Sequence, residues 1–214
     1  VWITQSTVEG DTHDIMAFLD MFPGLDQRIV QTLQEGGDLS ALEDEHVAAL
    51  RRLIGEAKAI PYANMILNDL RSGLDKVVIF GHHREPMRAI KEFLERKSNS
   101  IKCVMIQGGT GEKERDDAVE QFNADPDCRV FLGNHRAAGV GLNLQAQCCS
   151  VDIFESDWTP SANAQSIKRV ARYGQTRETR ARFISLDHWL EEAIEGANRD
   201  KTARILSLGL PELL

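Results

Sequence analysis

Three residues in the last third of the chain, Gln165, Arg169 and Arg172, have the types and spacing to bind a phosphate group. In an α-helix, positions i, i+4 and i+7 share one face, so these three side chains can converge on one target. Two guanidinium groups directed at one place repel each other unless an anion lies between them, and a triphosphate is the natural anion. The alternative is a pair of arginines on a solvated helix face.

The glycine-rich loop GNHRAAGVGLNL, residues 133–144, could bring the backbone close to a ligand. Small residues permit close approach, and glycine also permits positive φ. A dinucleotide fingerprint would place Glu155 on a ribose, but Leu144 stands where the third glycine belongs. The glycines also begin several residues after the preceding predicted strand. A ligand-binding loop and a purely structural turn therefore both remain open.

The charge of the chain is uneven along the sequence. The formal net charge of −8 counts against a nucleic-acid partner. A short basic segment is nevertheless compatible with phosphate binding, although a solvated helix face would have the same composition. Its residues are Lys168, Arg169, Arg172, Arg177, Arg180 and Arg182.

Composition indicates a globular protein inside the cell. Hydrophobic residues make up 42% of the 214 positions, yet no apolar run approaches the roughly 20 residues that span a bilayer. The four cysteines form no Cys-x-x-Cys pair, which favours buried, reduced thiols. The start, VWITQSTVEG, has no secretory signal and no initiating Met, so we expect a trimmed start and no membrane partner. The expected location is the cytoplasm of a bacterial or phage-infected cell, or a eukaryotic nucleus.

From residue 56 onward, short apolar strands alternate with amphipathic helices. Strands are predicted at 76–80, 101–106, 129–132, 151–154 and 181–186, and helices at 59–71, 86–96, 112–123, 161–171 and 189–206. This alternation predicts an α/β fold with a parallel sheet covered by helices on both faces. The glycine-rich loops should then lie at the carboxyl edge of the sheet, where such folds bind ligands. Residues 1–55 read as polar and helical.

Four segments, in this order, resemble motifs IV, IVa, V and VI of Swi/Snf-type superfamily 2 ATPases. They are VIFGHH at 78–83, QGGT at 107–110, the loop at 137–144, and DWTPSANAQSIKRVARYGQT at 157–176. The resemblance covers roughly residues 57–210. The FGHH string, Glu56-Ala57-Lys58 and Val170 look most like the HepA-related, annealing-helicase branch.

The resemblance implies a RecA-like second lobe whose motif VI arginines reach across a cleft to an ATP held by a first lobe. Arg169 and Arg172 would then be catalytic, one steadying the γ-phosphate and the other acting as an arginine finger. Gln165 would help to set the contact between the lobes. Motif V would meet the nucleotide and the opposing lobe through Gly139, Gly141 and Asn143. The implied organisation is an interlobe helical segment at 1–55, a RecA-like helicase C-terminal lobe at 56–186 and a C-terminal helical extension at 187–214.

The resemblance also implies sequence-independent contacts with the DNA backbone. Gly108, Gly109 and Thr110 offer backbone N–H groups and a hydroxyl to a phosphate. The same path would include His82, His135 and Arg136. His82, close to a strand end, could equally be structural. His135 stands where the family usually has Ser or Thr.

The sequence contains no G-x-x-x-x-G-K-[ST] motif and no strand-terminal Asp-Glu-x-His. The resemblance therefore implies that ATP and Mg²⁺ are held mainly by the N-terminal lobe of the same polypeptide, with no metal ligand in this chain. The predicted function is the C-terminal motor lobe of an ATP-dependent DNA translocase or helicase, inactive by itself. The main alternative is a non-catalytic DNA-binding or interaction module that keeps the fold. A nucleotide-dependent oxidoreductase is disfavoured by Leu144.

Overall fold

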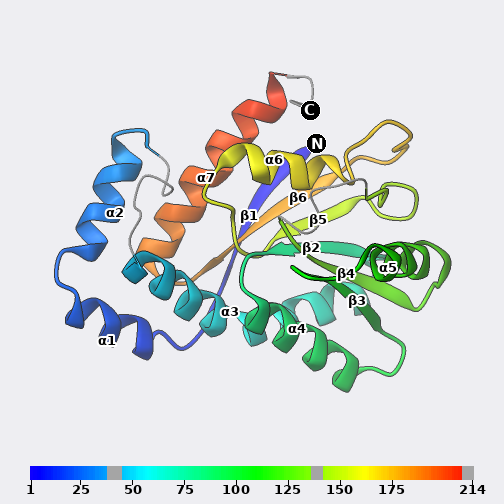
Figure 1. The fold of residues 1–214 in the computed structure, drawn as a ribbon, viewed down its shortest axis with the longest axis horizontal. Helices are drawn as coiled ribbons and strands as arrows, with labels where there is room; N and C mark the ends of the chain where they lie inside the picture. Colours follow the sequence, from blue (N-terminus) through cyan, green and yellow to red (C-terminus); the bar gives the residue numbers. More distant parts are fainter. Residues whose placement is uncertain (38–44, 136–141, 209–214) are drawn as a thin grey trace.

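The computed structural model describes residues 1–37, 45–135 and 142–208. Within these ranges the chain forms a six-stranded sheet in the order β1-β6-β5-β2-β4-β3, with every pair parallel (Figure 1). The strands are β1 (Trp2–Val8), β2 (Val77–Gly81), β3 (Lys102–Ile106), β4 (Cys128–Asn134), β5 (Ser150–Ile153) and β6 (Arg180–Leu186). The predicted parallel α/β fold is confirmed.

Helices cover both faces of the sheet, and alternate strand residues pack on opposite sides. In β2, Val77 and Ile79 pack against α3 (Glu45–Arg71) and α4 (Arg84–Lys97). Val78 and Phe80 face the opposite side, where α5 (Glu112–Ala124) and α6 (Pro160–Lys168) pack. Burial on both faces explains why the central strands read as continuous apolar runs.

The N-terminal stretch was predicted to be helical, and this prediction is wrong for its first residues. Trp2–Val8 forms β1, paired in parallel with β6 along its whole length, from Trp2 beside Arg180 to Val8 beside Leu186. The strand lies at the edge of the sheet and is only partly buried, so its side chains are largely polar. Its β-branched residues, Ile3, Thr4, Thr7 and Val8, are typical of a strand.

Two short helices, α1 (His13–Met21) and α2 (Leu25–Gln34), follow β1 and pack with the first half of α3. The α3 helix is continuous from Glu45 to Arg71, so the predicted boundary at residue 55 lies inside one helix. Pro61 within α3 has no N–H to donate to the carbonyl of Ala57. Gly10 packs against that carbonyl so closely that a Cβ there would lie 2.5 Å from the oxygen.

The C-terminal helix was predicted correctly and is α7 (Trp189–Ser207), which packs on α6, β6 and β1. The helix predicted at 161–171 is shorter than expected, because α6 ends at Lys168. Of the helices in the described ranges, none is both long and apolar enough to cross a membrane.

Candidate functional site

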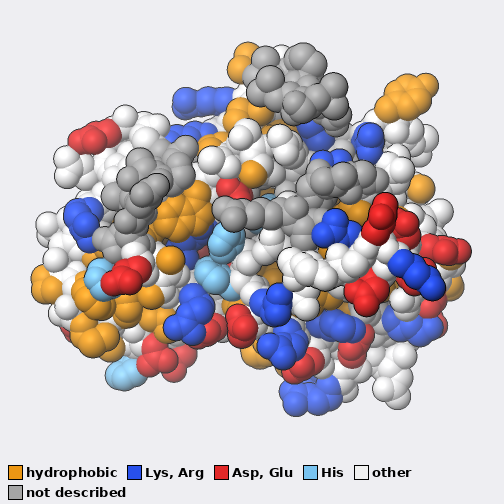
Figure 2. Space-filling view, viewed as in Figure 1, with side chains coloured by type: hydrophobic (Ala, Val, Ile, Leu, Met, Phe, Trp, Pro, Cys, Tyr) orange, Lys and Arg blue, Asp and Glu red, His pale blue; other side chains and the backbone are white. Residues whose placement is uncertain are grey.

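A pocket of about 270 Å³ opens at the carboxyl ends of β2, β3 and β4, and we call it the edge pocket. Its lining combines methionine and isoleucine side chains with polar residues. It is lined by His82, His83, Arg84, Met87, Met105, Ile106, Gln107, Gly108 and Asn134. Figure 2 shows histidine side chains gathered near the middle of this face of the molecule, with Lys and Arg side chains next to them. The structure therefore brings the predicted residues His82 and Gly108 together.

The second wall of the edge pocket is the tight turn at residues 107–110. The N–H of Thr110 donates to the carbonyl of Gln107 at 3.1 Å, and the N–H of Gln107 donates to Thr110 Oγ1 at 3.1 Å. Gly109 has a φ of +92°, a conformation that side chains rarely adopt. Arg84 Nη2 donates to the carbonyl of Gly108 at 3.1 Å and so ties the turn to the start of α4. Gly108 and Gly109 are exposed, so their backbone can meet a ligand.

The first wall is the turn at His82 and His83, between β2 and α4. Glu155, just after β5, accepts hydrogen bonds from the backbone N–H groups of both histidines at 2.8 Å and from His83 Nδ1 at 2.7 Å. Burial by itself would raise the pKa of Glu155, but the hydrogen bonds and charge of His83 outweigh burial and lower the pKa to about 2. The turn is therefore held by a buried, ionised carboxylate.

His82 brings a neutral ring to the edge pocket. Burial and the nearby charge of Arg51 lower the pKa of His82 to about 4, so the imidazole is uncharged at neutral pH. Two buried polar atoms beside the pocket, His82 Nδ1 and Gln107 Oε1, have no hydrogen-bond partner among the described residues. Such atoms are uncommon in folded proteins, and a ligand is one explanation for them.

His135 was predicted to contact DNA, and in the structure its side chain is turned into the interior. The ring is buried and stacks near Phe80, with ring centroids 5.7 Å apart. Its Nε2 donates to the carbonyl of Glu155 at 2.7 Å, and its Nδ1 accepts from Ser166 Oγ at 2.8 Å. Burial lowers the pKa of His135, which keeps the ring neutral. His135 therefore ties α6 to the end of β5, while the neighbouring Arg136 lies outside the described residues.

The arginines predicted for a phosphate site lie in and after the end of α6. Arg169 is the C-cap residue and is half-buried, while Arg172 follows in a turn, so the three side chains do not share one helix face. Gln165 is exposed on α6. Arg172 Nη1 donates to Asn143 Oδ1 at 2.9 Å, which brings together residues of the predicted motifs V and VI. The other predicted motif V residues, Gly139 and Gly141, lie outside the described ranges.

Residues 169–175, which we call the arginine turn, are fixed by a contact that sequence reasoning missed. The Gln175 side-chain amide donates to the carbonyls of Gln145, Cys148 and Val170, at 3.1, 2.8 and 3.3 Å. The N–H of Gln175 also donates to the carbonyl of Arg172 at 3.0 Å, and Gly174 has a φ of +91°. This tight turn leaves the Tyr173 side chain 99% exposed. The sequence signal was the Gly-Gln pair, but two of the three carbonyls that Gln175 binds lie 30 and 27 positions upstream.

The edge pocket and the arginine turn lie at opposite ends of the sheet. Because α6 connects two parallel strands, it starts near the carboxyl end of β5 and runs back toward the amino end of β6. The nine residues of α6 span about 13 Å at 1.5 Å per residue. The predicted site residues therefore form two separate groups.

The basic segment does not form one phosphate-binding patch. Arg182 is buried and donates to both carboxylate oxygens of Asp152, at 3.1 and 2.6 Å, and to Asp69 at 2.9 Å. Burial alone would lower the pKa of Arg182, but the charge and hydrogen bonds of Asp152 outweigh burial and raise the pKa above its ordinary value. Arg177 faces Asp75 at 3.7 Å. By contrast, no carboxylate in the described part of the chain lies within ion-pair distance of Arg172.

The described residues contain no group of three or more His, Cys, Asp or Glu side chains placed to hold a metal ion. The arginine side chains of the arginine turn are instead hydrogen-bond donors. Arg172 has five N–H donors, and Asn143 accepts from one of them. A donor-rich turn of this kind fits an anion such as a nucleotide phosphate, not a cation.

Comparison with known proteins gives matches along most of the chain. The helicase conserved C-terminal domain family matches residues 59–174. The chromatin-remodeling ATPase INO80 of Emericella nidulans is 27% identical over 165 residues, 76% of this chain and 10% of that protein. Its counterpart in Cryptococcus neoformans is 30% identical over 156 residues, 73% of this chain and 9% of that protein. The chain thus spans about a tenth of the length of these relatives.

Solved structures show the same fold at lower identity. The Sulfolobus solfataricus SWI2/SNF2 ATPase core in complex with dsDNA aligns with a TM-score of 0.67 and 18% identity, covering 97% of this chain and 46% of that one. The isolated C-terminal domain of the same type of ATPase aligns with a TM-score of 0.61 and 16% identity, covering 97% of this chain and 89% of that one. These likenesses agree with the RecA-like architecture of the sheet.

Proposed function

Because the chain belongs to the helicase conserved C-terminal domain family, as a C-terminal lobe of the Swi/Snf type, we propose that it is the second motor lobe of an ATP-dependent DNA translocase. In this role it faces a first RecA-like lobe of the same polypeptide. It contributes the arginine turn to an ATP site between the lobes and the edge pocket to a DNA track.

The observation that carries the proposal is the Arg172–Asn143 pair. Arg172 is held by one neutral side chain, so its charge is not neutralised by a carboxylate of the described residues. A half-exposed guanidinium on a fixed turn can reach a phosphate across a cleft without reorganising. Arg172 is therefore the proposed arginine finger, and Arg169, at the end of α6, steadies the ground-state γ-phosphate. Exposed Gln165 faces the opposing lobe.

ATP, when bound to the first lobe, would supply the γ-phosphoryl group, and the accompanying Mg²⁺ would neutralise part of the phosphate charge. The residues of this chain then orient and stabilise that group. Arg172 and Arg169 donate hydrogen bonds to phosphate oxygens, and Asn143 fixes the plane of the Arg172 guanidinium.

DNA would bind at the edge pocket, away from the arginine turn. The exposed backbone of Gly108 and Gly109, the Thr110 hydroxyl and the uncharged His82 ring suit phosphate and sugar contacts without sequence readout. The dsDNA complex of a relative with this fold supports a DNA partner. Separation of the two groups fits a motor in which lobe closure links ATP turnover to movement on DNA.

The experiment is the rate of ATP hydrolysis, at saturating duplex DNA, by a polypeptide that contains both lobes. Arg172→Ala should lower the turnover rate by roughly 10³, the scale on which arginine fingers act. The matched control is Arg177→Ala, which removes an exposed arginine from the same segment and should leave the rate unchanged. If Arg172→Ala turns over like the control, the arginine-finger role is refuted. A wild-type polypeptide that binds duplex DNA without hydrolysing ATP would instead favour the alternative, a non-catalytic DNA-binding or interaction module.

A further inference from the structure

We propose that Glu155 is a positioning residue for the DNA-facing edge: its carboxylate holds the His82–His83 turn where the edge pocket and Arg84 can meet a DNA backbone. This inference rests on the proposed function, because it assumes that the edge pocket binds DNA. It assigns a specific task to a residue that touches neither the nucleotide nor DNA.

The carboxylate is hydrogen-bonded by the His82–His83 turn and enclosed by glycines of β2 and α3. It accepts both N–H groups of the His82–His83 turn and the His83 ring N–H. A Cβ at Gly81 would lie 3.3 Å from Glu155 Oε2, and a Cβ at Gly55 of α3 would lie 2.3 Å from Glu155 Oε1. Glycine at both positions gives the carboxylate its space. Displacement of the carboxylate would therefore break the hydrogen bonds that hold the turn.

The His82–His83 turn also positions other parts of the edge pocket. Asn134 Nδ2 donates to the carbonyl of His82 at 2.7 Å, so the turn is held from the ends of both β4 and β5. Arg84, directly after the turn, begins α4 and donates to the carbonyl of Gly108. A shift of the turn would consequently displace Arg84 and the 107–110 loop together, which are the groups proposed to meet phosphate.

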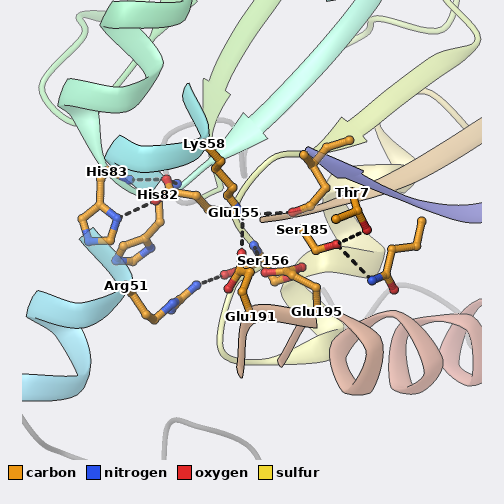
Figure 3. A network of polar contacts seen from close by, with 12 residues as sticks. Thr7, Arg51, Lys58, His82, His83, Glu155, Ser156, Ser185, Glu191 and Glu195 are labelled. Carbon is orange, nitrogen blue, oxygen red and sulfur yellow. Dashed lines mark hydrogen bonds and ion pairs between the residues drawn. The ribbon is translucent and has the colours of Figure 1, made fainter. Parts of the chain in front are cut away.

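The neighbouring buried carboxylate of Glu195 makes different contacts, so Glu195 provides a control. Figure 3 shows Glu155 beside His82 and His83, with Ser156, Glu191 and Glu195 in the same network. Ser156 Oγ donates to Glu195, and Lys58 donates to Glu191, so these carboxylates tie α7 to the end of β5 and to α3. Of the described acidic residues, only Glu155 bonds the His82–His83 turn.

The test compares Glu155→Gln with Glu195→Gln in the polypeptide that contains both lobes. The measured quantities are the dissociation constant for a fluorescent duplex, the DNA concentration that half-maximally stimulates ATP hydrolysis, and the rate at saturating DNA. A glutamine at 155 can accept fewer of the three N–H groups. The dissociation constant and the DNA concentration for half-maximal stimulation should therefore each rise by about fivefold or more. The saturated rate should stay within about twofold of the wild type. Glu195→Gln should change neither DNA concentration.

His83→Ala provides a second variant, since it removes the ring contact and one side chain of the pocket lining but keeps the carboxylate and both backbone N–H contacts. It should raise the dissociation constant by a smaller factor, about two- to threefold. It decides the matter if Glu155→Gln does not fold. Equal DNA affinity in the wild type and in every folded variant would overturn the role of Glu155 alone. Absence of DNA binding by the wild type would overturn the DNA track and this inference together.

Discussion

Gly55 lies in the interior of α3, where a methyl group has no space. In an open helix, Gly→Ala stabilises by about 1 kcal/mol. Here the new Cβ would meet Glu155 Oε1 at 2.3 Å, Glu155 Cδ at 3.1 Å and Pro86 Cγ at 3.2 Å. Overpacking costs about 1–3 kcal/mol, and each hydrogen bond to a charged group that breaks costs about 1.5–3 kcal/mol more. Gly55→Ala should therefore lower the free energy of unfolding by about 3 kcal/mol net.

The assay is thermal and urea unfolding of the chain, with Gly196→Ala as the control. Gly196 is also inside a helix, α7, but the nearest atom to a Cβ there is Gln5 Oε1 at 4.0 Å. Gly196→Ala should stabilise by about 1 kcal/mol. For a protein of this size, the Gly55→Ala melting temperature should fall by roughly 6–12 °C. If both alanines stabilise the chain, the packing of α3 over the Glu155 carboxylate is refuted.

Three further predictions concern charge. Arg172→Ala should lower the melting temperature by no more than about 4 °C, since it loses one exposed hydrogen bond, and a larger loss of stability would indicate a structural role. Arg172→Lys should not restore ATP turnover, since an ammonium group lacks the planar, multi-donor geometry of a guanidinium. The affinity for duplex DNA should fall steadily with added salt and show no dependence on base sequence; a salt-independent affinity would remove the phosphate contacts. Burial, and after it the charge of Glu191, raises the pKa of Glu195 to about 7. The folded chain therefore binds the carboxyl proton of Glu195 more tightly than the unfolded chain does. The stability that this group contributes is lost as the pH rises from about 4.5 to 7. The unfolding free energy of Glu195→Gln minus that of the wild type should therefore increase across this window; parallel pH profiles would contradict the shift.

The sequence predicted the central strands well because a strand buried on both faces has a continuous apolar run. Val77 to Phe80 is such a run, and every one of its residues is buried. The edge strand β1 was missed because its partly exposed side chains include Gln5 and Ser6, which are not typical of a strand. An edge strand depends on its neighbour for pairing, and that partner, β6, lies almost 180 positions away.

The candidate site could be predicted in its residue types but not in its geometry. The spacing of Gln165, Arg169 and Arg172 suggested one helix face, yet the chain leaves the helix after Lys168. The arginine turn depends on hydrogen bonds from Gln175 to distant carbonyls, which no local propensity encodes. Likewise, His135 turns inward because Ser166 and the Glu155 carbonyl complement its two ring nitrogens. Long-range polar contacts were therefore the main information missing from the sequence patterns.

The most direct test of the motor-lobe account is the rate of ATP hydrolysis with and without duplex DNA. It should be measured for the 214-residue chain alone and for a polypeptide that joins it to a first RecA-like lobe. The account predicts no hydrolysis by the chain alone and hydrolysis stimulated by duplex DNA when both lobes are present. DNA-stimulated turnover by the isolated chain, or none by the two-lobe polypeptide, would contradict it.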